Sequence, residues 1–269
     1  MQKLKKIKKG KIKIVLLLFI FSALIVAIIY GLFLMIKPYY SIKARSDNIK
    51  NYNESRTGEE RAYAWIRVQG TNIDYPIIDS LLDYTTLAQI DGDFTWTVGK
   101  FEELPKHAVI LGHNVRNLSA NPIITDSKHN KFEQLPSFLY YNFIKDNKYV
   151  QLTINDKDYL FKIFSVAIIE EKDLKRNTKD ETTEDFIKFI NESIDDSIYD
   201  FDVDVNENDK VISLVTCTRM YGPNSDYDLK IDARMLREKE VIKNYRVQKN
   251  KNYEKIDKIM RGEENEQSA

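Results

Sequence analysis

Two side chains that lie far apart in the sequence could together perform nucleophilic catalysis. Cys217 is the only cysteine of the chain, and it follows the apolar run 211–216 at the point where a strand-like pattern gives way to a turn-rich loop. A thiol reacts as the thiolate, so it needs a base or a cation nearby. His113 ends another apolar run and follows Gly112. We therefore predict a fold that brings His113 to Cys217, as in a cysteine-dependent acyl transferase or protease.

Both residues also have a purely structural interpretation. A free cysteine is often an inert part of a hydrophobic core, and a lone histidine at a strand end is more often structural than catalytic. The glycine before His113 indicates either a close backbone approach or unusual backbone dihedral angles. The other two histidines, His107 before a strand and His129 in the polar run 127–131, are expected to face solvent.

The composition argues against several other functions. The 41 lysines and arginines balance the 41 aspartates and glutamates, so no basic excess indicates nucleic acid binding. One cysteine and three histidines without ligand spacing argue against a metal site, and no glycine-rich phosphate loop occurs. We therefore expect neither a metal site nor a glycine-rich phosphate-binding loop. Paired acids for glycosidase chemistry stay open, because acids are plentiful and nothing singles out a pair.

An apolar segment near the N-terminus predicts a membrane anchor. Residues 14–36 carry no charged side chain, and a helix of this length would span a hydrocarbon core of about 30 Å. Seven lysines lie within residues 1–13, which predicts a basic tail in the cytoplasm and the remaining protein outside a single-pass cell-membrane anchor. A cleaved signal peptide is the alternative, but its apolar region would be only about 7–15 residues long.

The remaining chain predicts a mainly β domain over residues 62–237, behind a polar extracytoplasmic spacer over 37–61. One clear helix is expected at 182–194, where a threonine can cap an apolar stripe. Because strands dominate, we expect a closed β-barrel with one or two peripheral helices. Residues 238–269 read as a charged C-terminal tail with an exposed helix at most. The strand-like runs are 64–69, 73–78, 107–111, 148–154, 158–169, 211–216 and 229–236.

Three of these segments together resemble the sortases, the membrane-anchored cysteine transpeptidases of Gram-positive bacteria. Residues 65–79 (WIRVQGTNIDYPIID) are similar to the family's opening hairpin, and 107–114 (HAVILGHN) to its histidine strand. Residues 211–218 (VISLVTCT) are similar to the signature strand, in which a threonine precedes the catalytic cysteine. The helix at about 183–194 resembles the feature that marks class B sortases.

The resemblance implies a two-step reaction. Cys217 would attack a carbonyl in the C-terminal sorting motif of a secreted protein and form an acyl-thioester, while His113 protonates the leaving amine. An amine of a peptidoglycan precursor would then resolve the thioester with His113 as the base. A pilus-type sortase, which uses a lysine side chain as acceptor, is a variant of this hypothesis. The family needs no metal or organic cofactor, although some sortases respond to calcium.

The sequence departs from the sortases at one functional position. The family's third residue is an arginine at the start of the strand after the cysteine loop, and that place falls on or near Asp228. Arg234 would lie roughly 20 Å farther along the strand. Arg219 is the first candidate for the missing positive charge, and Lys230 is the second. An acid near a thiolate raises a thiol's pKa. A catalytically weak or silent sortase-fold protein that binds a peptide or a wall component is therefore the alternative, followed by a plain membrane-tethered structural domain.

Overall fold

The chain divides into two compact units, Met1–Arg45 and Ser46–Ala269. The computed structural model describes residues 17–30, 45–54, 61–80, 95–98, 100–101, 103–126, 131–175, 178–242 and 244–263. In the first unit, residues 17–30 form a helix whose large apolar side chains are exposed. The predicted anchor at 14–36 and the basic tail at 1–13 lie partly or wholly outside the described residues. Among the residues that are described, no helix is long and apolar enough to cross a membrane.

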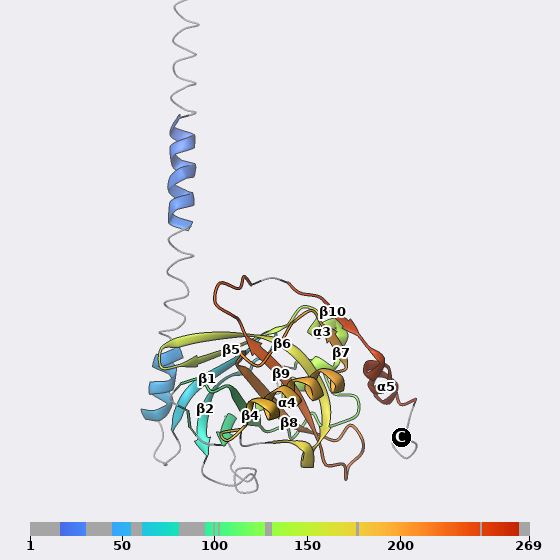
Figure 1. Cartoon of the computed structure of the whole chain (residues 1–269). Coiled ribbons are helices and arrows are strands. Elements are labelled where there is room, and N and C mark those ends of the chain that lie inside the picture. Colours follow the sequence, from blue (N-terminus) through green and yellow to red (C-terminus); the bar gives the residue numbers. More distant parts are fainter. Residues whose placement is uncertain are drawn as a thin grey trace, which may run out of the picture. The chain divides into compact units, whose positions relative to one another are not determined.

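The second unit is built on a closed barrel, as the sequence predicts (Figure 1). Its strand order is β1-β2-β3-β4-β8-β9-β6-β5, with parallel pairing between β2 and β3 and between β4 and β8. The remaining neighbours are antiparallel. The strands are β1 (Ala62–Val68), β2 (Asp74–Ser80), β3 (Thr95–Val98), β4 (His107–Gly112), β5 (Tyr149–Ile154), β6 (Lys157–Glu170), β8 (Val211–Thr218) and β9 (Tyr227–Met235).

Alternating side chains give each barrel strand an inner and an outer face. In β4, Ala108 and Ile110 belong to the main core inside the barrel, whereas Val109 and Leu111 belong to a second buried cluster with Val215 of β8. A two-residue turn joins β5 and β6. Its residues Asn155 and Asp156 both have positive φ, which matches the twist of a tight hairpin.

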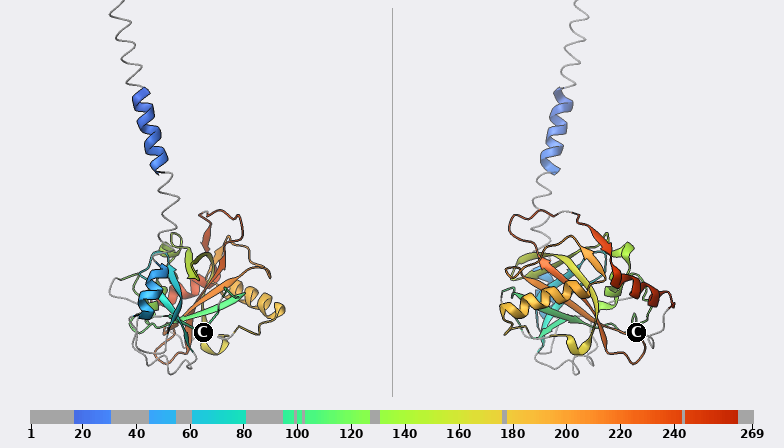
Figure 2. Two further views of the ribbon diagram at one scale, coloured as in Figure 1. Left: turned by 90° about the vertical axis from the view of Figure 1, so that its left-hand side faces the viewer. Right: turned by 45° about the vertical axis from the view of Figure 1, so that its right-hand side comes forward.

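Helix α4 (Thr183–Asp196) covers part of the outer face of the barrel, and it is the helix that the sequence predicts. It begins with a capping box between Thr182 and Asp185. Its buried residues Phe186 and Ile190 pack against Phe164 of β6 and Val211 of β8. Figure 2 shows α4 outside the strands in both views. The two short 3-10 helices are η1 (Lys131–Leu139) and η2 (Glu171–Asp173), and α3 spans Tyr141–Ile144.

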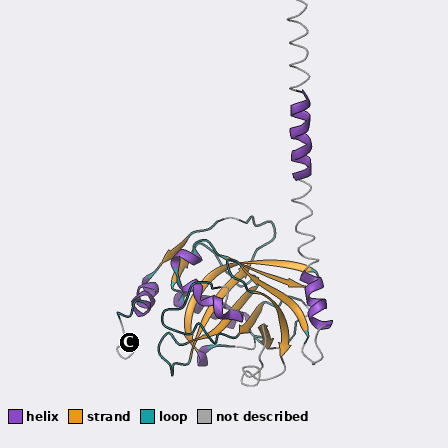
Figure 3. Ribbon diagram, turned by 180° about the vertical axis from the view of Figure 1, so that it is seen from behind, coloured by secondary structure: helices purple, strands orange, loops and turns teal. Residues whose placement is uncertain are grey.

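The expected charged tail at 238–269 instead contributes to the fold as far as residue 263. Strand β10 (Val247–Lys249) pairs with β7 (Tyr199–Phe201), and α5 (Lys251–Met260) follows it along the side of the domain (Figure 3). Helix α5 buries Tyr253 and Ile256 in the main core. The sequence allowed an exposed helix here, but the burial of one face was not predicted, because a helically spaced apolar stripe lies hidden among many lysines and acids.

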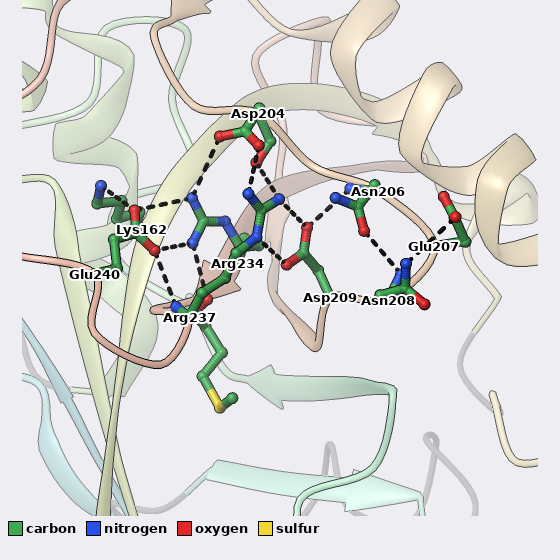
Figure 4. Close-up of polar contacts among 10 residues, drawn as sticks. Lys162, Asp204, Asn206, Glu207, Asn208, Asp209, Arg234, Arg237 and Glu240 are labelled. Carbon is green, nitrogen blue, oxygen red and sulfur yellow. Dashed lines mark hydrogen bonds and ion pairs between the residues drawn. The ribbon is translucent and has the colours of Figure 1, made fainter.

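An ion-pair network holds the segment after β9 against the barrel (Figure 4). Arg234 is 1% exposed and pairs with Glu240, which also accepts a hydrogen bond from Lys162. Arg237 binds Asp209 through two nitrogens, at 2.8 and 2.7 Å. The hydrogen bond from Arg234 is the main reason that the pKa of Glu240 is lowered to about 2. This network therefore stabilises the domain mainly when its carboxylates are ionised.

Candidate active site

The register of β4 and β8 brings His113 beside Cys217. The two strands are parallel neighbours, and their last registered pair is Leu111 with Val215. Two residues farther along come His113 and Cys217, so both continue the outer face of their strands. Neighbouring strands lie about 4.7–4.9 Å apart, so the two side chains start from adjacent backbone positions. Both residues are half-buried, as a reactive pair that must meet a substrate would be.

Two hydrogen bonds keep the strands together at this point. The Thr216 hydroxyl donates to the carbonyl of Gly112 at 2.6 Å. The Asn114 side-chain amide donates to the carbonyl of Cys217 at 3.0 Å. The first bond precedes the pair and the second follows it. The threonine before the cysteine therefore has a structural role here, which is to fasten β8 to β4 just before the thiol.

Gly112 is needed because the backbone before His113 is approached closely. A Cβ atom at Gly112 would lie 2.5 Å from Cγ of Phe132, well inside any normal contact. Phe132 is the second residue of η1, and its backbone N–H donates to the carbonyl of His113 at 3.0 Å. Of the two predicted reasons for the glycine, the close approach is the one that the structure confirms.

The loop after His113 is fixed by two buried asparagines that sequence analysis overlooked. Asn114 and Asn117 are 5% and 3% exposed. The backbone N–H of Asn117 donates to the Asn114 side chain at 3.0 Å, and the Asn117 amide donates to the Glu133 carbonyl at 2.8 Å. Their role could have been predicted from the sequence, because asparagine side chains commonly form hydrogen bonds with nearby backbone groups in turns. Asn114 therefore links the histidine loop to the cysteine backbone.

Asp228 lies directly opposite Cys217 in the antiparallel pair of β8 and β9. Directly opposed residues point to the same face, with Cβ atoms about 4.5–5.5 Å apart. Asp228 is 3% exposed. The sequence-based expectation that Asp228 occupies the start of this strand is confirmed. An acidic residue, rather than the arginine of the sortases, thus lies opposite the thiol, and an ionised acid at such a place disfavours a thiolate.

Arg219 lies in the loop just after β8. Its guanidinium donates to the carbonyl of Pro223 at 2.6 Å, and its backbone N–H donates to the carbonyl of Leu118 at 2.9 Å. The side chain is exposed. These contacts give Arg219 a part in closing its own loop, and its predicted part in the chemistry stays a prediction.

The other two cations lie elsewhere on β9. Lys230 shares the face of Asp228, as its strand parity predicts, but its ammonium lies 3.3 Å from Oδ2 of Asp232. In the register of β8 and β9, Arg234 lies opposite Val211, at the far end of β8 from Cys217. That places it about six residues, or roughly 20 Å, from the level of Cys217. Its own partner is Glu240 in the network of Figure 4.

The prediction that His107 faces solvent is wrong, and His129 lies outside the described residues. His107 is 5% exposed and stacks on Phe189 of α4, with ring centres 4.1 Å apart. Its Nδ1 lies 3.2 Å from Glu181 and its Nε2 lies 3.0 Å from the Ser213 hydroxyl. The histidine is buried because α4, which is distant in sequence, folds over the start of β4.

The outer face that carries His113 and Cys217 is covered in part by the segment between β6 and α4. Leu174 packs against the cluster of Val109, Leu111 and Val215. In the described part of the chain, no group of three or more histidine, cysteine or acidic residues could hold a metal ion. A cavity of about 470 Å³ is lined by Asp209, Lys210 and Arg237, but it lies at the far end of β8 from Cys217.

Comparisons with known proteins find sortases among the similar proteins. No protein-family model matches the chain. Sortase B of Staphylococcus aureus is 24% identical over 196 residues, which cover 70% of this chain and 74% of that protein. The X-ray structure of Clostridium perfringens sortase B is 27% identical with a TM-score of 0.56, over 71% of this chain and 100% of that chain. The Staphylococcus aureus sortase B–substrate complex is 19% identical with a TM-score of 0.53, over 74% of this chain and 85% of that chain.

In each of these three comparisons the matched part covers 70–74% of this chain. In sequence and in fold the chain is therefore similar to the class B sortases.

Proposed function

We propose that this chain is a class B-like sortase that attaches secreted proteins to the cell wall. It would cleave a C-terminal sorting signal through an acyl-thioester on Cys217 and transfer the protein to an amine of peptidoglycan. The observation that carries the proposal is the adjacency of His113 and Cys217 at the ends of two paired parallel strands. A nucleophile and a general acid–base on neighbouring strand ends have the arrangement that acyl transfer needs.

In the first step, the Cys217 thiolate attacks the carbonyl carbon of the scissile peptide bond. The carbon–nitrogen bond breaks, and His113 in its protonated form gives its proton to the leaving amine. The N-terminal part of the substrate stays on Cys217 as a thioester. A half-buried thiol suits this step, because the peptide can reach it from the outer face while the strand holds it in place.

In the second step, an acceptor amine attacks the thioester carbonyl. His113, now neutral, accepts a proton from the attacking nitrogen, and the carbon–sulfur bond breaks to release Cys217. Support for an amine acceptor comes from solved class B relatives, since one is a substrate complex and another is a complex with triglycine. A pilus-type acceptor, a lysine side chain, would use the same residues.

The proposal includes a membrane location. The charge-free run 14–36 behind seven lysines supports a single-pass anchor with the N-terminus in the cytoplasm and the barrel outside the cell, in a Gram-positive organism. Carbonate extraction of membranes tests this part alone. The full-length protein should stay in the membrane fraction, and its release would contradict the anchor.

One observation favours a second candidate function, a weak or silent sortase-fold protein that binds a peptide or a wall component. Asp228 stands opposite the thiol at the place of the sortase arginine. Arg219 stays the first candidate for a replacement cation. A methanethiosulfonate reagent separates the two functions. A catalytic Cys217 should react in the folded protein and be protected by a sorting peptide, whereas reaction only after denaturation would favour the silent protein.

Turnover of a peptide library tests the main proposal. The protein is incubated with sorting-type peptides and a panel of amines that includes triglycine and a lysine side-chain amine, and mass spectrometry identifies the products. We expect cleavage and amine transfer that disappear in Cys217→Ala and His113→Ala. Unchanged turnover in Cys217→Ala would overturn the assignment of the nucleophile.

A further inference from the structure

A buried ionic contact connects α4 to the strand opposite the thiol. The Lys230 ammonium lies 3.3 Å from Oδ2 of Asp232 and donates to the Ser193 hydroxyl of α4 at 3.0 Å. It also lies over the ring of Phe189 of α4, 4.9 Å from its centre. Asp232 and Ser193 are 0% exposed, and Lys230 is 7% exposed. The lysine therefore has all its described partners on β9 and α4.

The contact continues across the strands beneath α4. The Ser213 hydroxyl donates to Oδ1 of Asp232 at 2.5 Å, and its oxygen lies 3.0 Å from Nε2 of His107. The other ring nitrogen of His107 lies 3.2 Å from Glu181, just before α4. One polar chain thus links both ends of α4 to β4, β8 and β9. We call it the α4 network, and its members are Glu181, His107, Ser213, Asp232, Lys230 and Ser193.

The order Glu181, His107, Ser213 resembles a serine nucleophile with its histidine and acid, but it cannot act as one. Ser213 is 1% exposed, so no substrate carbonyl can reach its hydroxyl. The hydroxyl also donates to Asp232 instead of to the histidine. The network therefore has a positioning role and no nucleophile of its own.

The α4 network reaches the immediate surroundings of Cys217. Lys230 is registered with Val215, and Asp228 is registered with Cys217, so Lys230 is the diagonal neighbour of the thiol on the same face. Diagonal neighbours lie about 7–8 Å apart. A peptide joined to Cys217 would cover that distance within two or three residues. The position of α4 is therefore set right next to the place where a bound substrate must lie.

We propose that Lys230, through Asp232 and Ser193, is a positioning residue that fixes α4 for binding of the sorting peptide. This inference rests on the proposed function. An ammonium needs oxygen partners at short range, so the link allows only one placement of α4 on β9, whereas apolar packing alone would tolerate several. Lys230 would act through α4 in substrate affinity and would not touch the reacting atoms.

The test compares two ways of breaking the link with one matched control, all in the full-length protein. Ser193→Ala removes a partner and leaves the ion pair intact. The double variant Lys230→Met with Asp232→Asn removes both charges, so no buried charge is left unpaired. Lys188→Met is the control, since Lys188 lies on the same helix but is 74% exposed and pairs with the exposed Glu192.

Two readouts are measured, namely peptide-turnover kinetics and hydrogen exchange of the α4 amides. We expect KM to rise about fivefold to tenfold in the double variant and less in Ser193→Ala, with kcat nearly unchanged, because binding in the ground and transition states is lost equally. The α4 amides should exchange faster in both variants, and Lys188→Met should match the wild type in both readouts.

The outcomes distinguish this inference from the proposed function. If the wild type turns over peptide and the double variant keeps its KM, Lys230 has no positioning role and only this inference fails. The same holds if kcat falls while KM stays constant, because that result would mean direct participation in the chemistry. If the wild type neither turns over nor binds any sorting peptide, the proposed function fails and takes this inference with it.

Discussion

Replacing Asp228 with asparagine should make Cys217 more reactive. The two residues are directly opposed in the β8–β9 pair, and Asp228 is 3% exposed, so little water screens the carboxylate from the sulfur. Asparagine keeps the size and most hydrogen-bonding capacity of the side chain but removes its charge. The thiolate should therefore be more stable in Asp228→Asn than in the wild type.

The size of the effect follows from the strand geometry. Two unit charges about 5 Å apart repel by about 1 to 3 kcal/mol when the effective dielectric constant lies between that of water and roughly 20. Since about 1.36 kcal/mol corresponds to tenfold, the thiolate fraction at neutral pH should rise roughly 5- to 150-fold. A more stable thiolate is also a weaker nucleophile, so the alkylation rate should rise only about 2- to 15-fold.

The assay is the rate of Cys217 alkylation by iodoacetamide between pH 6 and 9 in the folded protein. Asp226→Asn is the matched control, because Asp226 lies two residues earlier in the exposed loop and only its backbone carbonyl has a described partner, the N–H of Glu171. Asp228→Arg places the sortase residue opposite the thiol, so its Cys217 alkylation rate should rise more than that of Asp228→Asn. Equal rates for the wild type, Asp228→Asn and Asp226→Asn would refute the reasoning.

Three further predictions concern the supports of the site and the fold. Gly112→Ala should cost about 1–3 kcal/mol in urea unfolding and reduce turnover, because the new Cβ collides with Phe132; wild-type stability would contradict the close approach. Asn114→Ala should lower the free energy of unfolding by about 1–3 kcal/mol and also lower kcat, because it removes the amide that donates to the Cys217 carbonyl. An unchanged kcat would count against this link. The folded pKa of Glu240, about 2, lies below its usual 4.5, so its stabilising contribution is complete above about pH 4.5 and is lost as the pH falls toward 2. Between pH 4.5 and 2.5 the free energy of unfolding should therefore fall less in Glu240→Gln than in the wild type, with a difference of up to about 2 kcal/mol in thermal unfolding.

The sequence contained enough to predict the barrel and to name His113 and Cys217 as a candidate pair. Apolar runs with alternating neighbours indicate strands, and residues at strand ends are held in place yet accessible, which singled out His113 and Cys217. What sequence periodicity could not provide is the parallel pairing of β4 with β8. The two strands are about a hundred residues apart in the chain, so no local pattern reports their contact. The resemblance to the sortases implied that His113 and Cys217 act together, and the strand pairing itself comes from the structure.

The errors have a common cause, which is burial by segments distant in sequence. His107 looked like a solvent-facing residue before a strand, but α4 covers it and Glu181 and Ser213 satisfy its ring nitrogens. The C-terminal segment looked like a charged tail, but its apolar residues Tyr253 and Ile256 pack into the main core. A charged sequence hides a narrow apolar stripe, and tertiary packing decides whether that stripe is used.

The resemblance to the sortases placed Asp228 at the start of the strand after the cysteine loop, and Asp228 does lie there, opposite Cys217. The role of Lys230 could not be predicted in this way. Parity placed it on the face of the thiol, where a free ammonium could have replaced the sortase arginine. Its partners on α4 and its neighbour Asp232 come from the tertiary fold, and they assign it to the α4 network instead.

The most direct test of the central claim is the intact mass of the protein after brief incubation with a sorting peptide and without an added amine. We predict a mass increase equal to the N-terminal acyl part of the peptide, located on the Cys217 fragment by proteolytic mapping, removed by hydroxylamine and absent from Cys217→Ala. Cleavage of the peptide with an adduct on another residue, or cleavage by Cys217→Ala at the wild-type rate, would contradict the account.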